Sequence, residues 1–177
     1  MSAKEEWRTY QAPRVVETAR LVLRPFSAAD HPAYALITSD ADVMRYVGTG
    51  VANTSDVAWR SMSMMLGHWE MRGYGLWALT LRDGPLMGHV GFIDVAGWPG
   101  FELGWLLGKD YWDKGYAFEA AEAARRIAFE DLKKDRVISL IRDGNAPSIR
   151  LAQKMGAQRE GEVELMGSAA GLWVHRS

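Results

Sequence analysis

Cysteine is absent from this 177-residue sequence, which excludes disulfide bonds, thiolate nucleophiles and cysteine-based zinc sites. The chain also lacks any run of about 18 apolar residues, the length that a membrane-spanning helix needs. Neither sign of charge is in excess, with 21 Lys and Arg against 22 Asp and Glu, and no basic stripe that would attract nucleic acid. The four histidines are dispersed, so no metal site is predicted.

What is present is the composition of one globular domain. Apolar residues make up 48% of the chain and charged residues 24%, which is typical of a protein with a buried core. The polar N-terminus lacks the apolar segment of a secretory signal, so a cytoplasmic protein is expected. Residues 1–13, which end at Pro13, are predicted to be a flexible leader, and residues 14–177 a single domain.

Hydrophobic periodicity and turn residues divide the chain into alternating strands and helices. The pattern predicts strands at 19–24, 76–81, 87–95, 101–107, 137–141, 160–165 and 172–175, and helices after Asp30 and at 54–73, 115–132 and 145–155. Alanines recur on one face of the 115–132 helix, so that it can pack closely against a sheet. This order of elements is typical of an α+β fold with a mixed sheet.

The most informative segment is residues 112–117 (WDKGYA), a turn rich in small residues between an apolar strand and the alanine-rich helix. Such a turn leaves several backbone N–H groups unpaired, at the positive end of a helix dipole. That arrangement favours the binding of a phosphate group. Residues 145–148 (NAPS) and 154–156 (KMG) follow it and begin and end the next predicted helix.

Together with residues 18–25 (TARLVLRP) and 102–105 (ELGW), these segments resemble the GNAT (Gcn5-related N-acetyltransferase) superfamily. Their order and spacing carry the resemblance, which runs from about Thr18 to Trp173, and they are most similar to the branch of ribosomal-protein N-terminal acetyltransferases. The resemblance implies a GNAT fold, whose central sheet is mixed, mostly antiparallel, and has about seven strands flanked by helices.

The resemblance also implies acetyl-CoA as co-substrate, and no metal. Its pyrophosphate would lie on the backbone of one loop, its pantetheine arm along the preceding strand, and an asparagine would contact the arm from the other side. In this sequence the residues so implied are Asp113, Lys114, Gly115, Tyr116, Ala117 and Phe118 in the loop, Trp105, Leu106 and Leu107 in the strand, and Asn145 and Ser148 in the next helix.

Several positions depart from the family pattern. Trp112 replaces a Gln or Arg that is usual across the superfamily, while Asp113 and Phe118 replace the usual Gly and Thr of this branch. The tyrosine that many members use as general acid is Ala152 here, and members of this branch resemble each other in having a serine, Ser148, in that role. We expect the Asp113 carboxylate to turn away from the diphosphate, so that only its amide contributes.

Acetyl transfer requires a base, because an ammonium group has no lone pair with which to attack the thioester. Glu102 is the first candidate, since its strand is expected to border the reaction centre; Glu160 and Glu164 are the next. A backbone N–H at about Leu106 is predicted to polarise the acetyl carbonyl. The implied scheme is direct attack of the amine within a ternary complex.

The acceptor implied by the resemblance is a primary amine, either the α-amine of a protein or peptide or that of a small molecule. Two alternatives remain open at this point: a non-catalytic acyl-CoA-binding module with the same fold, and a transferase that uses a longer acyl chain. A homodimer and a monomer are both compatible with the sequence.

Overall fold

The structure is a computed structural model that describes residues 11–177. The first elements are β1 (Val16–Glu17), β2 (Leu21–Arg24), the 3-10 turn η2 (Ala28–Asp30), α1 (His31–Thr38), α2 (Ala41–Met44), α3 (Ser55–Arg72), β3 (Leu76–Leu81) and β4 (Leu86–Ile93). The remaining elements are β5 (Glu102–Leu107), η3 (Lys109–Tyr111), α4 (Tyr116–Glu130), β6 (Val137–Ile141), α5 (Ala146–Lys154), β7 (Gln158–Leu165) and β8 (Ser168–His175).

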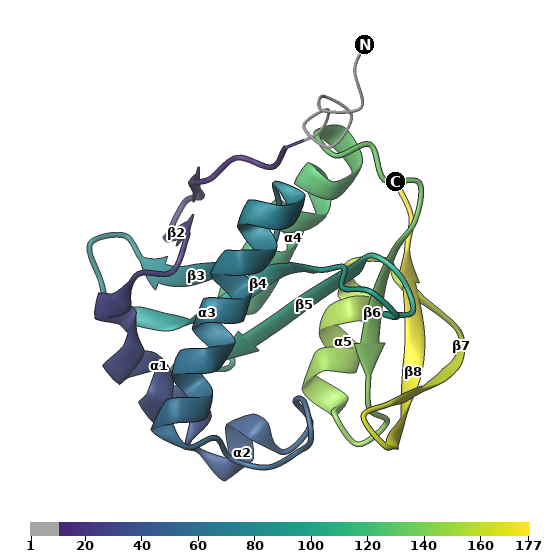
Figure 1. The fold of residues 1–177 in the computed structure, drawn as a ribbon. Coiled ribbons are helices and arrows are strands. Elements are labelled where there is room, and N and C mark those ends of the chain that lie inside the picture. Colours follow the sequence, from purple (N-terminus) through teal and green to yellow (C-terminus); the bar gives the residue numbers. More distant parts are fainter. Residues whose placement is uncertain (1–10) are drawn as a thin grey trace.

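The strands form one mixed sheet of eight strands in the order β1-β2-β3-β4-β5-β6-β8-β7 (Figure 1). Every neighbouring pair is antiparallel except β5 and β6, which are parallel. The predicted α+β fold with a mostly antiparallel sheet is therefore confirmed. The additional strand is β1, whose two residues are too few to give an alternating pattern in the sequence. Within residues 11–177, no helix combines the length and apolar character needed to cross a membrane.

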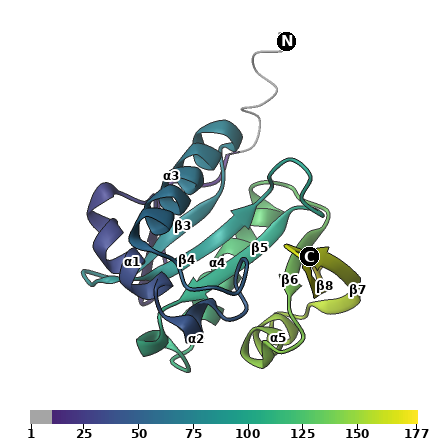
Figure 2. The same cartoon turned by 60° about the horizontal axis from the view of Figure 1, so that its bottom comes forward.

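Helices cover both faces of the sheet. Figures 1 and 2 show α1 and α3 on one face and α4 on the other. The α3 residues Met62 and Met65 pack in one cluster with Ala78 of β3, and the alanine face of α4, including Ala120 and Ala124, packs in another cluster on the opposite side. On the small-residue face of α4, Ala117 at its start is half-buried, and the following alanines are buried, namely Ala120, Ala121, Ala124 and Ala128.

Helix ends follow local signals in the sequence. Gly73 ends α3 in the left-handed conformation with φ 75°, a backbone shape that glycine adopts without strain. Asn145 precedes α5, and its side-chain oxygen accepts a hydrogen bond from the Ser148 N–H at 3.3 Å. Of the predicted leader, residues 1–10 lie outside the described part of the chain; Ala12 is buried, and its N–H donates to the Gly73 carbonyl.

Candidate functional site

The centre of the site is a gap between the two parallel strands of the sheet. β5 and β6 share one register pair, Glu102 with Ile138, and beyond it they diverge, as Figures 1 and 2 show. Strands that stop pairing leave backbone donors and acceptors without sheet partners. The gap is therefore a place where a ligand with amide groups could complete the hydrogen bonds of both strands.

The β5 groups that face this gap follow from the ladder on its other edge. The Gly108 N–H donates to the Met87 carbonyl at 2.8 Å, and the register pairs Leu106 with His89. Hydrogen-bonded pairs alternate along an antiparallel ladder, so Leu106 directs its backbone groups to His89, while Trp105 and Leu107 direct theirs to the gap. Sequence analysis predicted a polarising N–H at about Leu106. The candidate donors for that role are therefore the N–H groups of Trp105 and Leu107, which face the gap.

One cavity of about 420 Å³ extends from the gap over the start of α4. It is lined by every residue that the sequence assigned to the co-substrate except Lys114, namely Trp105, Leu106, Leu107, Asp113, Gly115, Tyr116, Ala117, Phe118, Asn145 and Ser148. The Lys114 ammonium instead donates to the Asp110 carbonyl at 2.7 Å. Asp113 lines the cavity, and that its carboxylate turns away from a bound diphosphate stays a prediction.

The loop before α4 has the backbone shape of an anion cradle. Asp113 and Gly115 both have positive φ angles, 58° and 77°, and Gly115 directly precedes the helix. The first N–H groups of a helix lack intrahelical partners, and here they belong to residues that line the cavity, including Tyr116 and Ala117. N–H groups at a helix N-terminus are suited to bind a diphosphate, which would accept their hydrogen bonds as an anion. The left-handed angle at Asp113 is one that glycine adopts with less strain than aspartate.

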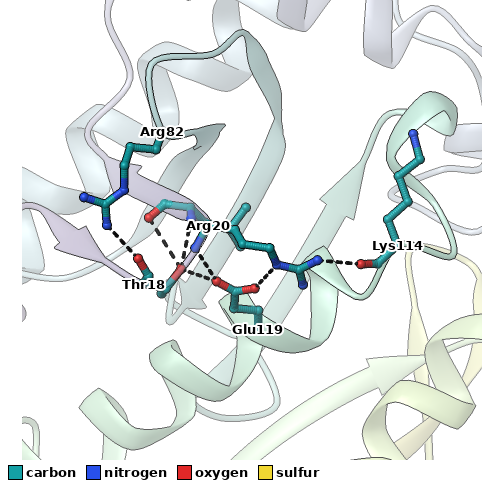
Figure 3. Close-up of polar contacts among 6 residues, drawn as sticks. Thr18, Arg20, Arg82, Lys114 and Glu119 are labelled. Atoms are coloured by element: carbon teal, nitrogen blue, oxygen red, sulfur yellow. Dashed lines mark hydrogen bonds and ion pairs between the residues drawn. The ribbon is translucent and has the colours of Figure 1, made fainter.

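An ion-pair network fixes the cradle to the sheet (Figure 3). Glu119, in the first turns of α4, accepts from the Thr18 hydroxyl at 2.6 Å and from Nε of Arg20 at 2.6 Å. The same guanidinium donates to the Lys114 carbonyl at 3.0 Å and lies 4.6 Å from the centre of the Tyr116 ring. The N-terminal TAR segment and the loop are therefore held together by contacts between residues about a hundred positions apart.

We expect Glu119→Gln to weaken acetyl-CoA binding by about threefold to tenfold, because Glu119 holds Arg20 and Arg20 holds the loop carbonyl of Lys114. The effect is expected to be modest, since the ion pair is partly exposed to solvent. Calorimetric titration with acetyl-CoA measures this change. Glu70→Gln is the matched control, since it removes another arginine pair, with Arg14, remote from the loop. Equal affinities for the Glu119 and Glu70 variants would show that the network does not position the cradle.

A second cavity, of about 450 Å³, lies on the α1 and α3 side of the sheet. Its lining includes Trp105, Leu106, Asn145 and Ser148, which also line the first cavity, so the two cavities meet at the gap. A co-substrate in one cavity and a second molecule in the other would therefore approach each other at these residues.

Ser148 lies where the two cavities meet. Its Oγ accepts a hydrogen bond from the Trp105 indole N–H at 3.2 Å, which leaves the hydroxyl hydrogen available to a ligand. Ala152, where many family members have tyrosine, is fully buried and lines neither cavity. Ser148 lines both cavities, and so does Tyr46, which the sequence did not single out.

Glu102 is buried in the wall of the second cavity, at the point where β5 and β6 separate. Its carboxylate accepts from the Trp98 indole at 2.6 Å and from the Leu140 N–H at 3.3 Å, a β6 donor that the separation leaves without a strand partner. Burial raises the pKa of Glu102 to about 7, and these two hydrogen bonds only partly oppose the rise. This carboxyl group can therefore bind and release a proton near neutral pH.

The other two carboxylates proposed from the sequence lie elsewhere. Glu160 pairs with Arg136 and Arg176, and neither Glu160 nor Glu164 lines the two cavities. Glu102 is the one of the three candidates that the fold brings to the site.

A buried pair in the second cavity was missed by sequence reasoning. Nδ1 of His89 lies 3.2 Å from the Tyr34 hydroxyl, and both residues are buried in the lining. Burial lowers the pKa of His89 to about 4, so the ring is neutral at pH 7. The only signal for it in the sequence was a polar residue within an apolar strand, which cannot identify a partner 55 residues away.

Comparisons with known proteins agree with this geometry. A family model described as "Acetyltransferase (GNAT) domain" matches residues 20–158. The uncharacterized N-acetyltransferase YnaD of Bacillus subtilis (strain 168) is 33% identical over 147 residues, which cover 82% of this chain and 84% of that protein.

Among solved structures, an acetyltransferase from Agrobacterium tumefaciens superposes with a TM-score of 0.83 at 28% identity, covering 95% of this chain and 97% of its own. RimJ of Mycobacterium smegmatis, solved in complex with CoA-disulfide, shares the fold with a TM-score of 0.73 at 18% identity, covering 95% and 85%. The family match over most of the chain, supported by the cradle and the divided sheet, leads to one assignment. This chain belongs to the GNAT family and is an acetyl-CoA-dependent acetyltransferase.

Proposed function

We propose that the protein transfers the acetyl group of acetyl-CoA directly to a primary amine while both substrates are bound. The observation that carries this proposal is the junction of two cavities at Trp105 and Ser148, between a phosphate cradle and a buried carboxyl group. One cavity would hold acetyl-CoA and the other the amine. Their junction brings the reactants together without a nucleophile from the protein.

Two parts of acetyl-CoA would bind at two places, the cradle and the gap. The N–H groups at the start of α4 would hold the pyrophosphate, and the gap-facing backbone of Trp105 and Leu107 would pair with the amides of the pantetheine arm. Asn145 would contact the arm from the α5 side. Bound there, acetyl-CoA supplies an activated thioester carbonyl.

The reaction forms a C–N bond from the amine to the acetyl carbonyl carbon and breaks the C–S bond to CoA. Glu102 would take the proton that the amine loses, through a water molecule, because its carboxyl group titrates near neutral pH. One of the two gap-facing N–H groups, of Trp105 or Leu107, would stabilise negative charge on the carbonyl oxygen, and the other would pair with the pantetheine arm. Ser148, whose oxygen accepts from the Trp105 indole, would pass its hydroxyl proton to the departing thiolate and take one back from the protonated nitrogen of the tetrahedral intermediate, so that CoA leaves as the thiol.

The proposal is tested by thiol release. Purified protein and acetyl-CoA are mixed with peptides, amino-acid amides, amino acids or polyamines, and free CoA is measured against an amine-free control. The expected result is that free CoA is released only when an amine is present, together with an equal amount of the N-acetylated amine. Binding of acetyl-CoA without amine-dependent release would contradict it and favour the non-catalytic module.

We expect Ser148→Ala to lower kcat by about tenfold to a hundredfold, with acetyl-CoA affinity changed less than about threefold, because the hydroxyl acts on the leaving group. Trp105→Phe removes the indole donor that holds the hydroxyl and should lower kcat in the same direction. Ser63→Ala, on the exposed side of α3, is the control. An unchanged kcat in Ser148→Ala would remove this residue from the mechanism.

A further inference from the structure

The charges of the second cavity restrict what can occupy it. Among residues 11–177, the only carboxylate side chain in its lining is Glu102, and neither lysine nor arginine lines it. The other titratable groups in the lining are Tyr34, Tyr46 and His89. Since His89 is neutral at pH 7, the lining offers no positive charge to a ligand.

Arg142 occurs beside the cavity without lining it, and its Nε is buried without a hydrogen-bond partner among residues 11–177. The Arg142 guanidinium donates to the Gly48 carbonyl at 2.5 Å, where it fastens the loop after α2 to the end of β6. Gly48 lines the cavity and Arg142 does not. An acceptor carboxylate in this cavity would therefore meet no lysine or arginine in the lining formed by residues 11–177, where desolvation without a paired cation is unfavourable.

Two exposed methionines lie at the mouth of the cavity, together with the exposed polar residue Thr49. Met64 on α3 is 56% exposed and Met166 in the β7–β8 turn is 57% exposed, and both belong to the lining. Flexible methionine side chains exposed around a cavity are suited to contact with apolar ligands of variable shape. A hydrated polycation would gain little from these surfaces.

The floor of the cavity is open between Glu102 and His89. Gly104 lies on β5 between Glu102 and Leu106 and is paired with Gly91 of β4. His89 is the β4 residue paired with Leu106. A side chain at Gly104 would meet only Ile93, with 3.7 Å from its Cβ to Cδ1. The floor therefore has room for a substituent between one acidic group and one neutral imidazole.

We propose that the acceptor is a primary monoamine with a neutral, mainly apolar substituent and no free carboxylate. This inference rests on the proposed function and adds the class of acceptor to it. One positive amine matches the single carboxyl group of the cavity, and an apolar substituent matches the methionines at its mouth. Free amino acids are disfavoured because their carboxylate has no cation, and polyamines because their further ammonium groups have no acid partner.

The test compares acceptors that differ in one group. Thiol release is measured with acetyl-CoA and either L-phenylalaninamide or L-phenylalanine, which differ only in the carboxyl group, and with spermidine. The expected kcat/KM is about a hundredfold or more higher for the amide than for the acid or spermidine. An acid or polyamine used as well as the amide would overturn the inference and leave the proposed function intact. No amine-dependent release with any of the three, under conditions where acetyl-CoA binds, would overturn both.

A charge placed at the mouth gives an independent test. Met64→Lys should raise kcat/KM for L-phenylalanine relative to L-phenylalaninamide by about tenfold, because it supplies the missing cation. Met71→Lys is the matched control: Met71 lies on the same helix, is 78% exposed and does not line the cavity. The same change in both variants, or none in Met64→Lys, would contradict the argument from charge.

Discussion

Replacing Glu102 with glutamine is expected to lower kcat by about 100- to 1,000-fold, because the variant cannot accept the proton of the attacking amine. In the native protein, log kcat should rise with pH and level off above an inflection near 7, the pKa to which burial raises Glu102. The variant should lose this inflection. Acetyl-CoA affinity should stay within about threefold, since Glu102 lines only the other cavity.

The pH–rate profiles of both proteins, measured by thiol release, test this expectation. Glu160→Gln is the matched control, because Glu160 is engaged with Arg136 and Arg176 outside the site. A Glu102 variant with an unchanged rate and an unchanged inflection would assign the base elsewhere.

Glu102 also makes the free energy of unfolding depend on pH. Its pKa is raised in the folded protein, from 4.5 to about 7, so the folded state binds this proton more tightly than the unfolded state. The resulting stabilisation is fully present below about pH 4.5 and is lost as pH rises through about 7. Relative to Glu102→Gln, the native protein should therefore lose free energy of unfolding between those values. Urea unfolding at several pH values measures it, and parallel curves for the two proteins would show that the carboxyl group is not desolvated.

Gly115→Val should weaken acetyl-CoA binding by about thirtyfold or more. Gly115 has a φ of 77° and directly precedes α4, and a β-branched side chain strains that conformation and shifts the N–H groups of the cradle. Gly156→Val is the matched control, since Gly156 has a φ of 81° with open space around it and lines neither cavity. Calorimetric titration compares the two, and equal affinities would mean that the loop does not hold the co-substrate.

The parts of the fold that sequence analysis predicted are those with local signals. Gly73 ends α3, Asn145 begins α5, and Gly115 begins α4 at the cradle. The conformational preference of each of these residues acts within one turn, so it can be predicted from the sequence. The alanine face of α4 follows from helical periodicity, which is also local.

The contacts that sequence analysis missed join residues distant in the chain. The bond from Trp105 to Ser148 spans 43 residues, and the pairs of Arg20 with Glu119 and of Tyr34 with His89 span 99 and 55. No periodicity or turn signal specifies which polar side chains meet across such separations. Sequence analysis put Glu102 before Glu160, but only the fold shows that the Glu102 carboxyl group lines the cavity and that of Glu160 does not.

The central claim is that two substrates meet at the junction of the cavities. Initial rates of thiol release, with acetyl-CoA and L-phenylalaninamide both varied, test it most directly. Double-reciprocal lines that intersect are expected, because both molecules must be bound before transfer. Parallel lines, with an acetylated protein intermediate found by mass spectrometry, would contradict direct transfer and require a nucleophile that this account does not contain.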